Sequence, residues 1–155
     1  RVMVAPTLTH LRAPALPPGF KWSTLGASAL AQAVGALRGS PLAQRQAHAE
    51  RLANAPVPFR ALAIQRRDDG AVVACGQSAS EGDLVGVYDV FVLEALRGQG
   101  LARALCTKLL DDARRDSARS AYLQVEADNH AARAVYFKLG FADGYAYHYR
   151  TRAAT

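Results

Sequence analysis

The alternation of apolar and polar positions predicts strands and amphipathic helices that share one core. Residues 84–92 form a near-continuous apolar run, which is typical of a central strand covered on both faces. In residues 98–118, Leu101, Leu105 and Leu109 recur at helical spacing, while charged residues occupy the opposite face. This segment therefore predicts a buried strand followed by a helix that packs against the sheet.

Similar patterns predict the other elements. Further strands are expected over residues 19–25, 58–68, 71–83 and 121–127, and one or two more over 141–152; Asp69-Gly70 would close a hairpin. Helices are expected over 27–40, 41–55 and 129–140. Residues 1–18 contain four prolines and predict an extended arm or linker. The domain would then comprise residues 19–155. A longer protein, of which this chain is the C-terminal part, is an alternative that the sequence leaves open.

Composition narrows the class of protein. A chain of 155 residues suits one domain with a real core. No apolar run approaches the ~20 residues that span a bilayer, and no signal-peptide pattern is present. Cys75 and Cys106 lack metal-ligand spacing and are interpreted as small buried hydrophobes. We therefore expect no metal, no membrane partner and a reducing, cytoplasmic setting.

The net charge of +6 is unevenly distributed. Residues 1–67 hold nine Lys/Arg and a single acid, Glu50, whereas residues 68–155 hold ten Lys/Arg and twelve acids. This excess suits an acidic partner, a phosphate-bearing ligand or nucleic acid, or it is a solvated arginine-rich surface. Aromatic residues are not interleaved with these arginines, which argues against nucleic acid.

A glycine-rich turn before the helix predicts an anion site. Gly98 and Gly100 would let an anion approach the free backbone N–H groups at the helix start, and Arg97 and Arg103 add positive charge. The Rossmann pattern fails because Arg103 replaces its third glycine, and the Walker pattern lacks Gly-Lys-Ser/Thr. The pattern that remains is Arg/Gln-x-x-Gly-x-Gly/Ala.

Two stretches of sequence strengthen this hypothesis. Residues 88–105 read YDVFVLEALRGQGLARAL, and residues 122–150 contain Asn129 followed by Tyr136, Leu139, Gly140 and Phe141. Both resemble the signatures of the GNAT family of N-acetyltransferases, and the resemblance extends over about residues 57–150. It implies an α/β fold whose mixed, mostly antiparallel sheet has six to seven strands, about four helices, and a splay between the fourth and fifth strands.

The resemblance also implies acetyl-CoA as co-substrate and a primary amine as acceptor. In that family pantetheine pairs with the splayed strand, here Val90, Phe91 and Val92, and the pyrophosphate lies on the helix start. Asn129 would reach the pantetheine or cap its own helix. The expected pyrophosphate contacts are Arg97, Gly98, Gln99, Gly100, Leu101, Ala102 and Arg103.

Catalysis would require a general base, an oxyanion donor and a proton for the departing thiolate. The sequence predicts Tyr136 as the acid, and backbone N–H groups near Phe91–Val92 as the oxyanion donor. Asp89 and Glu126 are both candidate bases. Some family members have a glutamate at the position where this chain has Gln124, and a glutamine cannot act as a base. A chain of ordered water molecules is therefore an alternative to a side-chain base. Aromatic and histidine candidates for the acceptor pocket are Tyr88, Tyr145, Tyr147 and His148.

Three functions remain open on this sequence. An acetyl-CoA-dependent N-acetyltransferase that works by direct attack on the thioester is favoured. The alternatives are a catalytically silent acetyl-CoA-binding regulatory module and a basic nucleic-acid-binding domain. The acceptor amine is not specified, and a homodimer is left open.

Overall fold

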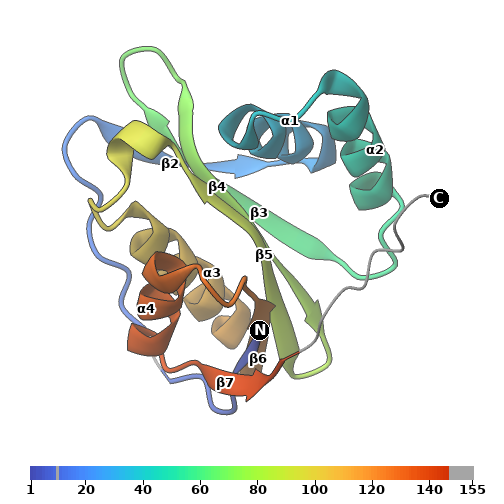
Figure 1. Ribbon diagram of the computed structural model, residues 1–155, viewed down its shortest axis with the longest axis vertical. Helices are drawn as coiled ribbons and strands as arrows, with labels where there is room; N and C mark the ends of the chain where they lie inside the picture. The colour runs from blue at the N-terminus through green and yellow to red at the C-terminus, as the bar shows by residue number, and fades with distance from the viewer. Residues whose placement is uncertain (10, 147–155) are drawn as a thin grey trace.

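A seven-stranded mixed sheet organises the residues that the computed structural model describes, 1–9 and 11–146 (Figure 1). Its order is β2-β3-β4-β5-β6-β1-β7. The pairs are antiparallel except β5–β6, which is parallel. The strands are β1 (Val2–Ala5), β2 (Phe20–Leu25), β3 (Phe59–Arg66), β4 (Val72–Glu81), β5 (Leu84–Val92), β6 (Ser120–Gln124) and β7 (Ala142–Tyr145). A mostly antiparallel sheet of this size confirms the predicted fold class.

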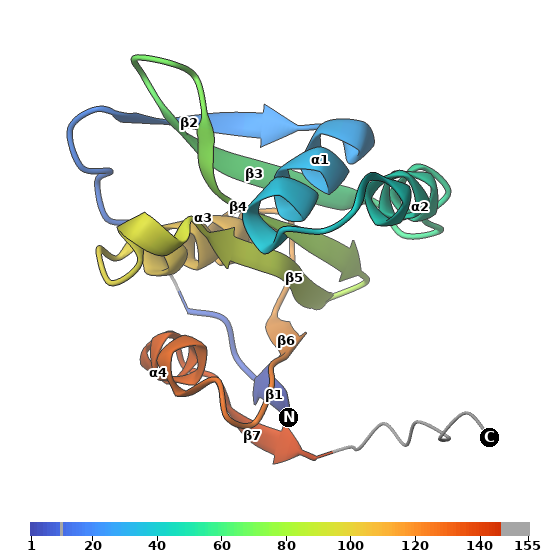
Figure 2. The ribbon, with the colours of Figure 1, turned by 45° about the horizontal axis from the view of Figure 1, so that its top comes forward.

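Four helices among the described residues cover the two faces of the sheet. They are α1 (Ala27–Arg38), α2 (Leu42–Ala53), α3 (Leu101–Arg115) and α4 (His130–Lys138), with a short 3-10 turn at Glu94–Leu96. Helices α1 and α2 lie on one side, and α3 and α4 lie on the other (Figures 1 and 2). The α3 leucines pack in the larger core cluster, and Leu30 and Val34 of α1 in the smaller.

The N-terminal segment corrects one prediction. Residues 1–18 were expected to form an extended arm, but β1 pairs with β6 on one side and β7 on the other. Val2, Met3 and Ala5 are buried, which explains why this short apolar run joins the sheet. The prolines begin only at Pro6, and the described part of residues 6–18 contains no helix or strand. The arm prediction is therefore wrong for β1.

The predicted splay is present between β5 and β6, which are the fourth and fifth strands of the sequence-based order once β1 is set aside. They pair only from Leu84–Ser120 to Val87–Leu123. On the β4 side, Gln77 pairs with Tyr88 and Cys75 with Phe91. Two residues of β5, Asp89 and Val90, therefore lie opposite one residue of β4, Gly76. This arrangement is a β-bulge. The bulge bends β5 where its pairing with β6 ends.

The C-terminal predictions are met in part. Strand β6 ends at Gln124, so Glu126 lies beyond the strand rather than at its end. Strand β7 accounts for the first part of the 141–152 prediction, and its remainder lies outside the described residues. In the described part of the chain, no helix has the length and apolar character to cross a membrane.

The burial of β1 generates a stability prediction. Met3 is completely buried in the larger core cluster. Met3→Ala should lower the free energy of unfolding by about 2–5 kcal/mol, because it removes buried surface and leaves a cavity. Leu42→Ala, at a position that is 69% exposed, is the control and should change it far less. If urea unfolding showed the same loss in the free energy of unfolding for both variants, this account of β1 would be contradicted.

Candidate active site

The loop between β5 and α3 has the geometry of an anion site. Gly98 and Gly100 both have φ of +81°, a left-handed conformation that glycine adopts without strain. A Cβ built at either residue meets nothing within 4 Å, so the space in front of the loop is open. Helix α3 has no side-chain cap and no acid in its first turn. Positive charge at this helix start is therefore not neutralised locally.

Several backbone donors at the start of α3 have no acceptor. Ala104 N–H is the first amide of α3 with an intrahelical partner, the carbonyl of Gly100 at 3.0 Å. The amides of residues 98–103 have no acceptor among the described residues. Arg97 and Arg103 are exposed beside them. All seven predicted pyrophosphate contacts thus lie on one continuous segment: Arg97, Gly98, Gln99, Gly100, Leu101, Ala102 and Arg103.

The free edge of β5 lies next to this loop. Leu93 N–H donates to the Val73 carbonyl of β4 at 2.7 Å. Because backbone groups alternate along a strand, the N–H and C=O of Val92 point to the opposite edge, toward the splay. Arg97 Nε donates to the Val92 carbonyl at 3.3 Å, which agrees with that direction. The Val92 N–H therefore faces the splay without a partner among the described residues, whereas the Val92 carbonyl is held by Arg97.

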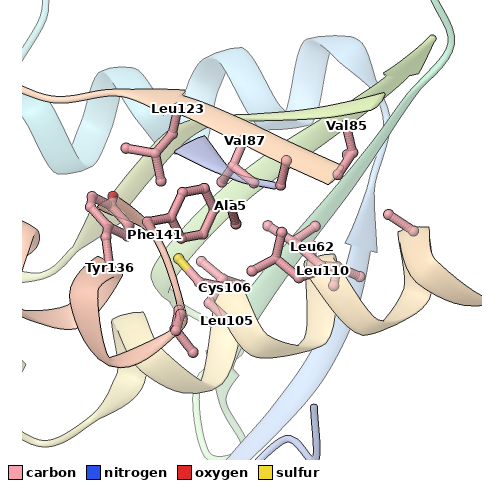
Figure 3. Close-up of a cluster of buried hydrophobic side chains, with 14 of the residues drawn as sticks. Ala5, Leu62, Val85, Val87, Leu105, Cys106, Leu110, Leu123, Tyr136 and Phe141 are labelled. Atoms are coloured by element: carbon pink, nitrogen blue, oxygen red, sulfur yellow. The ribbon is translucent and has the colours of Figure 1, made fainter. Parts of the chain in front are cut away.

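Helix α4 carries the predicted acid. Asn129 is its N-cap, and the Asn129 side-chain oxygen accepts from Ala132 N–H at 3.1 Å. Seven residues later, Tyr136 is 8% exposed and its ring meets Phe141 edge-on, with centroids 6.0 Å apart (Figure 3). Burial, and then the neighbouring Cys106 thiol, raise the pKa of the Tyr136 hydroxyl. Its hydroxyl has no hydrogen-bond partner among the described residues.

Asp89 occupies the β5 bulge in a strained conformation. Its φ is +54°, which few residues other than glycine adopt, although aspartate tolerates it better than most. The carboxylate accepts a hydrogen bond from Gln77 Nε2 at 2.6 Å and lies 3.1 Å from His48 Nε2 of α2. The predicted candidate Asp89 is thus paired, and its partner His48 comes from a segment without a sequence signature.

The other predicted residues are more dispersed. Glu126 is exposed in the turn before α4, and its backbone carbonyl accepts from Asn129 N–H. Tyr88 is hydrogen-bonded to Tyr122 across the splay, and burial followed by this bond raises the pKa of Tyr88. Tyr145 is 63% exposed on β7. Tyr147 and His148 lie outside the described residues.

A hollow of about 250 Å³ opens beside the His48–Asp89 pair, and we call it the α1–α2 hollow. Helices α1 and α2 form most of its wall, and Asp89 is the one residue of β5 in it. Its lining consists of Ala31, Val34, Gly35, Arg38, Ser40, Gln44, Arg45, Ala47, His48, Arg51 and Asp89. Sequence reasoning missed this site. One signal in the sequence could have pointed to it: Arg45, His48 and Arg51 recur every three residues along α2, which puts basic side chains on one side of the helix.

The two cysteines are unsuited to nucleophilic catalysis. Both side chains are buried, at 0% and 1% exposure for Cys75 and Cys106. Burial raises the pKa of each thiol to about 12, and the Asp89 carboxylate adds to the rise at Cys75. Only the thiolate is a good nucleophile, so both stay inert at neutral pH. No group of three metal-ligating side chains occurs in the described part of the chain.

The splayed sheet and the open start of α3 agree with what the comparisons with known proteins show. The profile of the acetyltransferase (GNAT) family matches residues 36–141. The chain therefore belongs to the GNAT acetyltransferase family, whose co-substrate is acetyl-CoA. No curated protein matches the chain in sequence.

Three solved structures show the same fold. A GCN5-related N-acetyltransferase from Sphaerobacter thermophilus has a TM-score of 0.72 at 24% identity, covering 91% of this chain and 47% of its own. A tandem GNAT protein from the clavulanic acid biosynthesis pathway has a TM-score of 0.71 at 22% sequence identity, and the match covers 83% of this chain and 44% of that protein. AAC(6')-Iy, in complex with the bisubstrate analogue CoA-S-monomethyl-acetylneamine, has a TM-score of 0.66 at 19% sequence identity. The match covers 86% of this chain and 99% of AAC(6')-Iy. The chain thus spans about half the length of the first two.

Proposed function

We propose that this chain is an acetyl-CoA-dependent N-acetyltransferase that acetylates a primary amine by direct attack on the thioester. The observation that carries the proposal is the run of unpaired amides at residues 98–103, next to the open edge of β5. A pyrophosphate suits these donors because it presents several anionic oxygens to one helix start. The bisubstrate analogue bound to AAC(6')-Iy, a protein of the same fold, supports the use of acetyl-CoA.

Binding would use two kinds of backbone contact. Residues 98–103 hold the pyrophosphate, with Arg97 and Arg103 contributing charge. Val90, Phe91 and Val92 lie beyond the short β5–β6 pairing. The backbone groups of Val90 and Val92 face the splay, where pantetheine amides can pair with them, whereas Phe91 pairs with Cys75 of β4. Asn129 orders the start of α4 as its cap, and we assign it no second contact.

The His48–Asp89 pair is our candidate for the general base. The Asp89 carboxylate accepts from His48 Nε2, which leaves the other ring nitrogen, Nδ1, to accept a proton from the amine. Gln77 holds the same carboxylate oxygen, so Asp89 orients the imidazole. Glu126 lies exposed beyond β6, and no described side chain pairs with it. Asp89 is therefore a positioning residue, and His48 takes the proton.

The remaining steps need a donor for the oxyanion and an acid for the thiolate. Val92 N–H, which points into the splay, can donate to the thioester oxygen as negative charge develops there. Tyr136 retains its proton at neutral pH, because a phenol ordinarily has a pKa of ~10 and burial raises the pKa of Tyr136 further. The same shift makes the phenol a weaker acid than usual. Transfer to a thiolate of pKa ~8.5 therefore requires direct contact between the two groups.

Acetyl-CoA binding is tested at Gly100. Gly100→Val should weaken acetyl-CoA by about tenfold or more, because its side chain fills the open space before the α3 amides and strains φ at +81°. Gly70→Val is a matched control, since Gly70 also has positive φ and no neighbour within 4 Å but lies in the β3–β4 turn. Calorimetry on both folded variants should show a loss only for Gly100→Val. An unchanged dissociation constant for that variant would remove the pyrophosphate assignment.

The acid is tested by Tyr136→Phe, which keeps the ring packed against Phe141 and removes only the hydroxyl. We expect kcat to fall by ~10²–10⁴-fold while acetyl-CoA binding barely changes. Thiol release with an active amine, under conditions where chemistry limits the rate, is the measurement. If the variant turned over at the parent rate, Tyr136 would be a packing residue. No turnover by the parent with any amine, despite acetyl-CoA binding, would instead indicate a silent binding module.

The base is tested by comparing three variants with an active amine. His48→Gln should lower kcat/KM by ~10²–10⁴-fold, because it removes the group that takes the proton. Asp89→Asn should have a smaller effect, because it only weakens the contact that orients the imidazole. Groups facing His48 include Asp89, Arg45 and Arg51, so ionic strength must be fixed. A change confined to Glu126→Gln would overturn the assignment.

A further inference from the structure

The α1–α2 hollow has a lining that is unusually rich in arginine. Arg38 comes from the last turn of α1, and Arg45 and Arg51 come from α2. Arg38 and Arg51 are exposed at the rim, and Arg45 is half-buried. Asp89 is the one acidic residue that lines the hollow in the described part of the chain. The wall therefore carries an excess of positive charge.

Arg45 is held in place by its surroundings. Its side chain packs across Gly35 of α1, where an added Cβ would lie 2.3 Å from Arg45 Cγ. Its Nε donates to the Ser40 carbonyl at 2.8 Å. The stem and one donor are thus fixed, while the terminal amino groups of the guanidinium have no partner among the described residues. Glycine at position 35 is what allows this arginine to lie between the two helices.

The positive charge of the hollow is not neutralised from within. None of Arg38, Arg45 and Arg51 forms an ion pair with a described residue. The Asp89 carboxylate is already engaged by Gln77 and His48. Residues 1–67, which include both helices, contain only one acid, Glu50. An anionic ligand group would supply the missing counter-charge.

The arginines and the proposed base are close enough to act on one small molecule. Arg45, His48 and Arg51 are three residues apart along α2, so they lie on one face of the helix with neighbouring Cβ atoms ~5–6 Å apart. A volume of about 250 Å³ suits a compact metabolite. A polycationic acceptor such as a polyamine would be repelled by the same wall.

We infer that the acceptor is a small primary amine that also carries an oxyanion, either a carboxylate or a phosphate, bound by Arg38, Arg45 and Arg51. The inference rests on the proposed N-acetyltransfer and names its substrate class. The arginines hold the oxyanion at the mouth of the hollow, and the amine then extends toward His48 and Asp89. Guanidinium groups suit this role because their parallel N–H donors match both anions.

Matched amine pairs test the substrate class. Thiol release from acetyl-CoA is measured with O-phosphoethanolamine against ethanolamine, with β-alanine against β-alaninamide, and with spermidine. In at least one pair, kcat/KM for the anionic amine should exceed that for its neutral counterpart by about 10- to 100-fold. If this is the O-phosphoethanolamine pair, the site prefers a phosphate; if it is the β-alanine pair, the site prefers a carboxylate. Equal rates within both pairs, or spermidine as the best acceptor, would overturn the inference.

Arginine variants locate the effect. Arg38→Gln and Arg51→Gln should each raise KM for the preferred anionic amine by about tenfold or more, with kcat and acetyl-CoA binding nearly unchanged. KM for the neutral counterpart should not rise, because that amine has no oxyanion for the arginines to bind. Arg119→Gln is the matched control, because Arg119 is an exposed arginine that does not line the hollow. An equal KM change in all three variants would contradict a site in the hollow.

Direct binding separates this inference from the proposed function. If no amine releases thiol, acetyl transfer fails as a function. Calorimetry with O-phosphoethanolamine and β-alanine still decides the inference. Binding to the parent that is lost in Arg38→Gln and Arg51→Gln but kept in Arg119→Gln would support it. No binding of either probe to the parent would overturn it.

Discussion

The short pairing between β5 and β6 is the constraint on which the site depends. The two strands are parallel neighbours over only four residue pairs, from Leu84–Ser120 to Val87–Leu123. A continuous sheet would consume the backbone donors and acceptors of β5 on both edges. The bulge at Asp89 bends the strand where the pairing ends, and the following residues keep one edge free. That edge ends beside the loop that leads into α3, since Arg97 Nε donates to the Val92 carbonyl, so the two parts of the proposed acetyl-CoA site are neighbours.

The same bulge also serves the opposite face. It turns Asp89 toward α2, where His48 meets its carboxylate, and Gln77 of β4 donates to the same carboxylate oxygen. A left-handed aspartate is strained, and strain of this kind persists only where surrounding contacts fix it. Here two hydrogen bonds to the side chain provide that fixation. The bulge thus leaves β5 with a free edge beside the start of α3 and places Asp89 in the wall of the α1–α2 hollow.

Charge is divided between these two regions by different means. At α3 it comes from the helix dipole, free amides and exposed arginines. In the hollow it comes from arginine side chains on two helices, held by a close approach at Gly35. No described acid forms an ion pair with the arginines of either region. The surplus of basic residues in the whole chain lies in residues 1–67, which include both helices of the hollow, so the charge at α3 depends more on the helix start itself.

The sequence alone determined the elements whose signals are local. The helical spacing of the α3 leucines, the apolar run of β5 and the glycines before α3 each act within a few residues, and all match the structure. β1 was misread because its four residues precede a proline-rich stretch, and only long-range pairing with β6 and β7 stabilises it. The His48–Asp89 pair spans 41 positions and has no local pattern. Such contacts are decided by how α2 packs over the β5 bulge, so only the tertiary structure could bring them together.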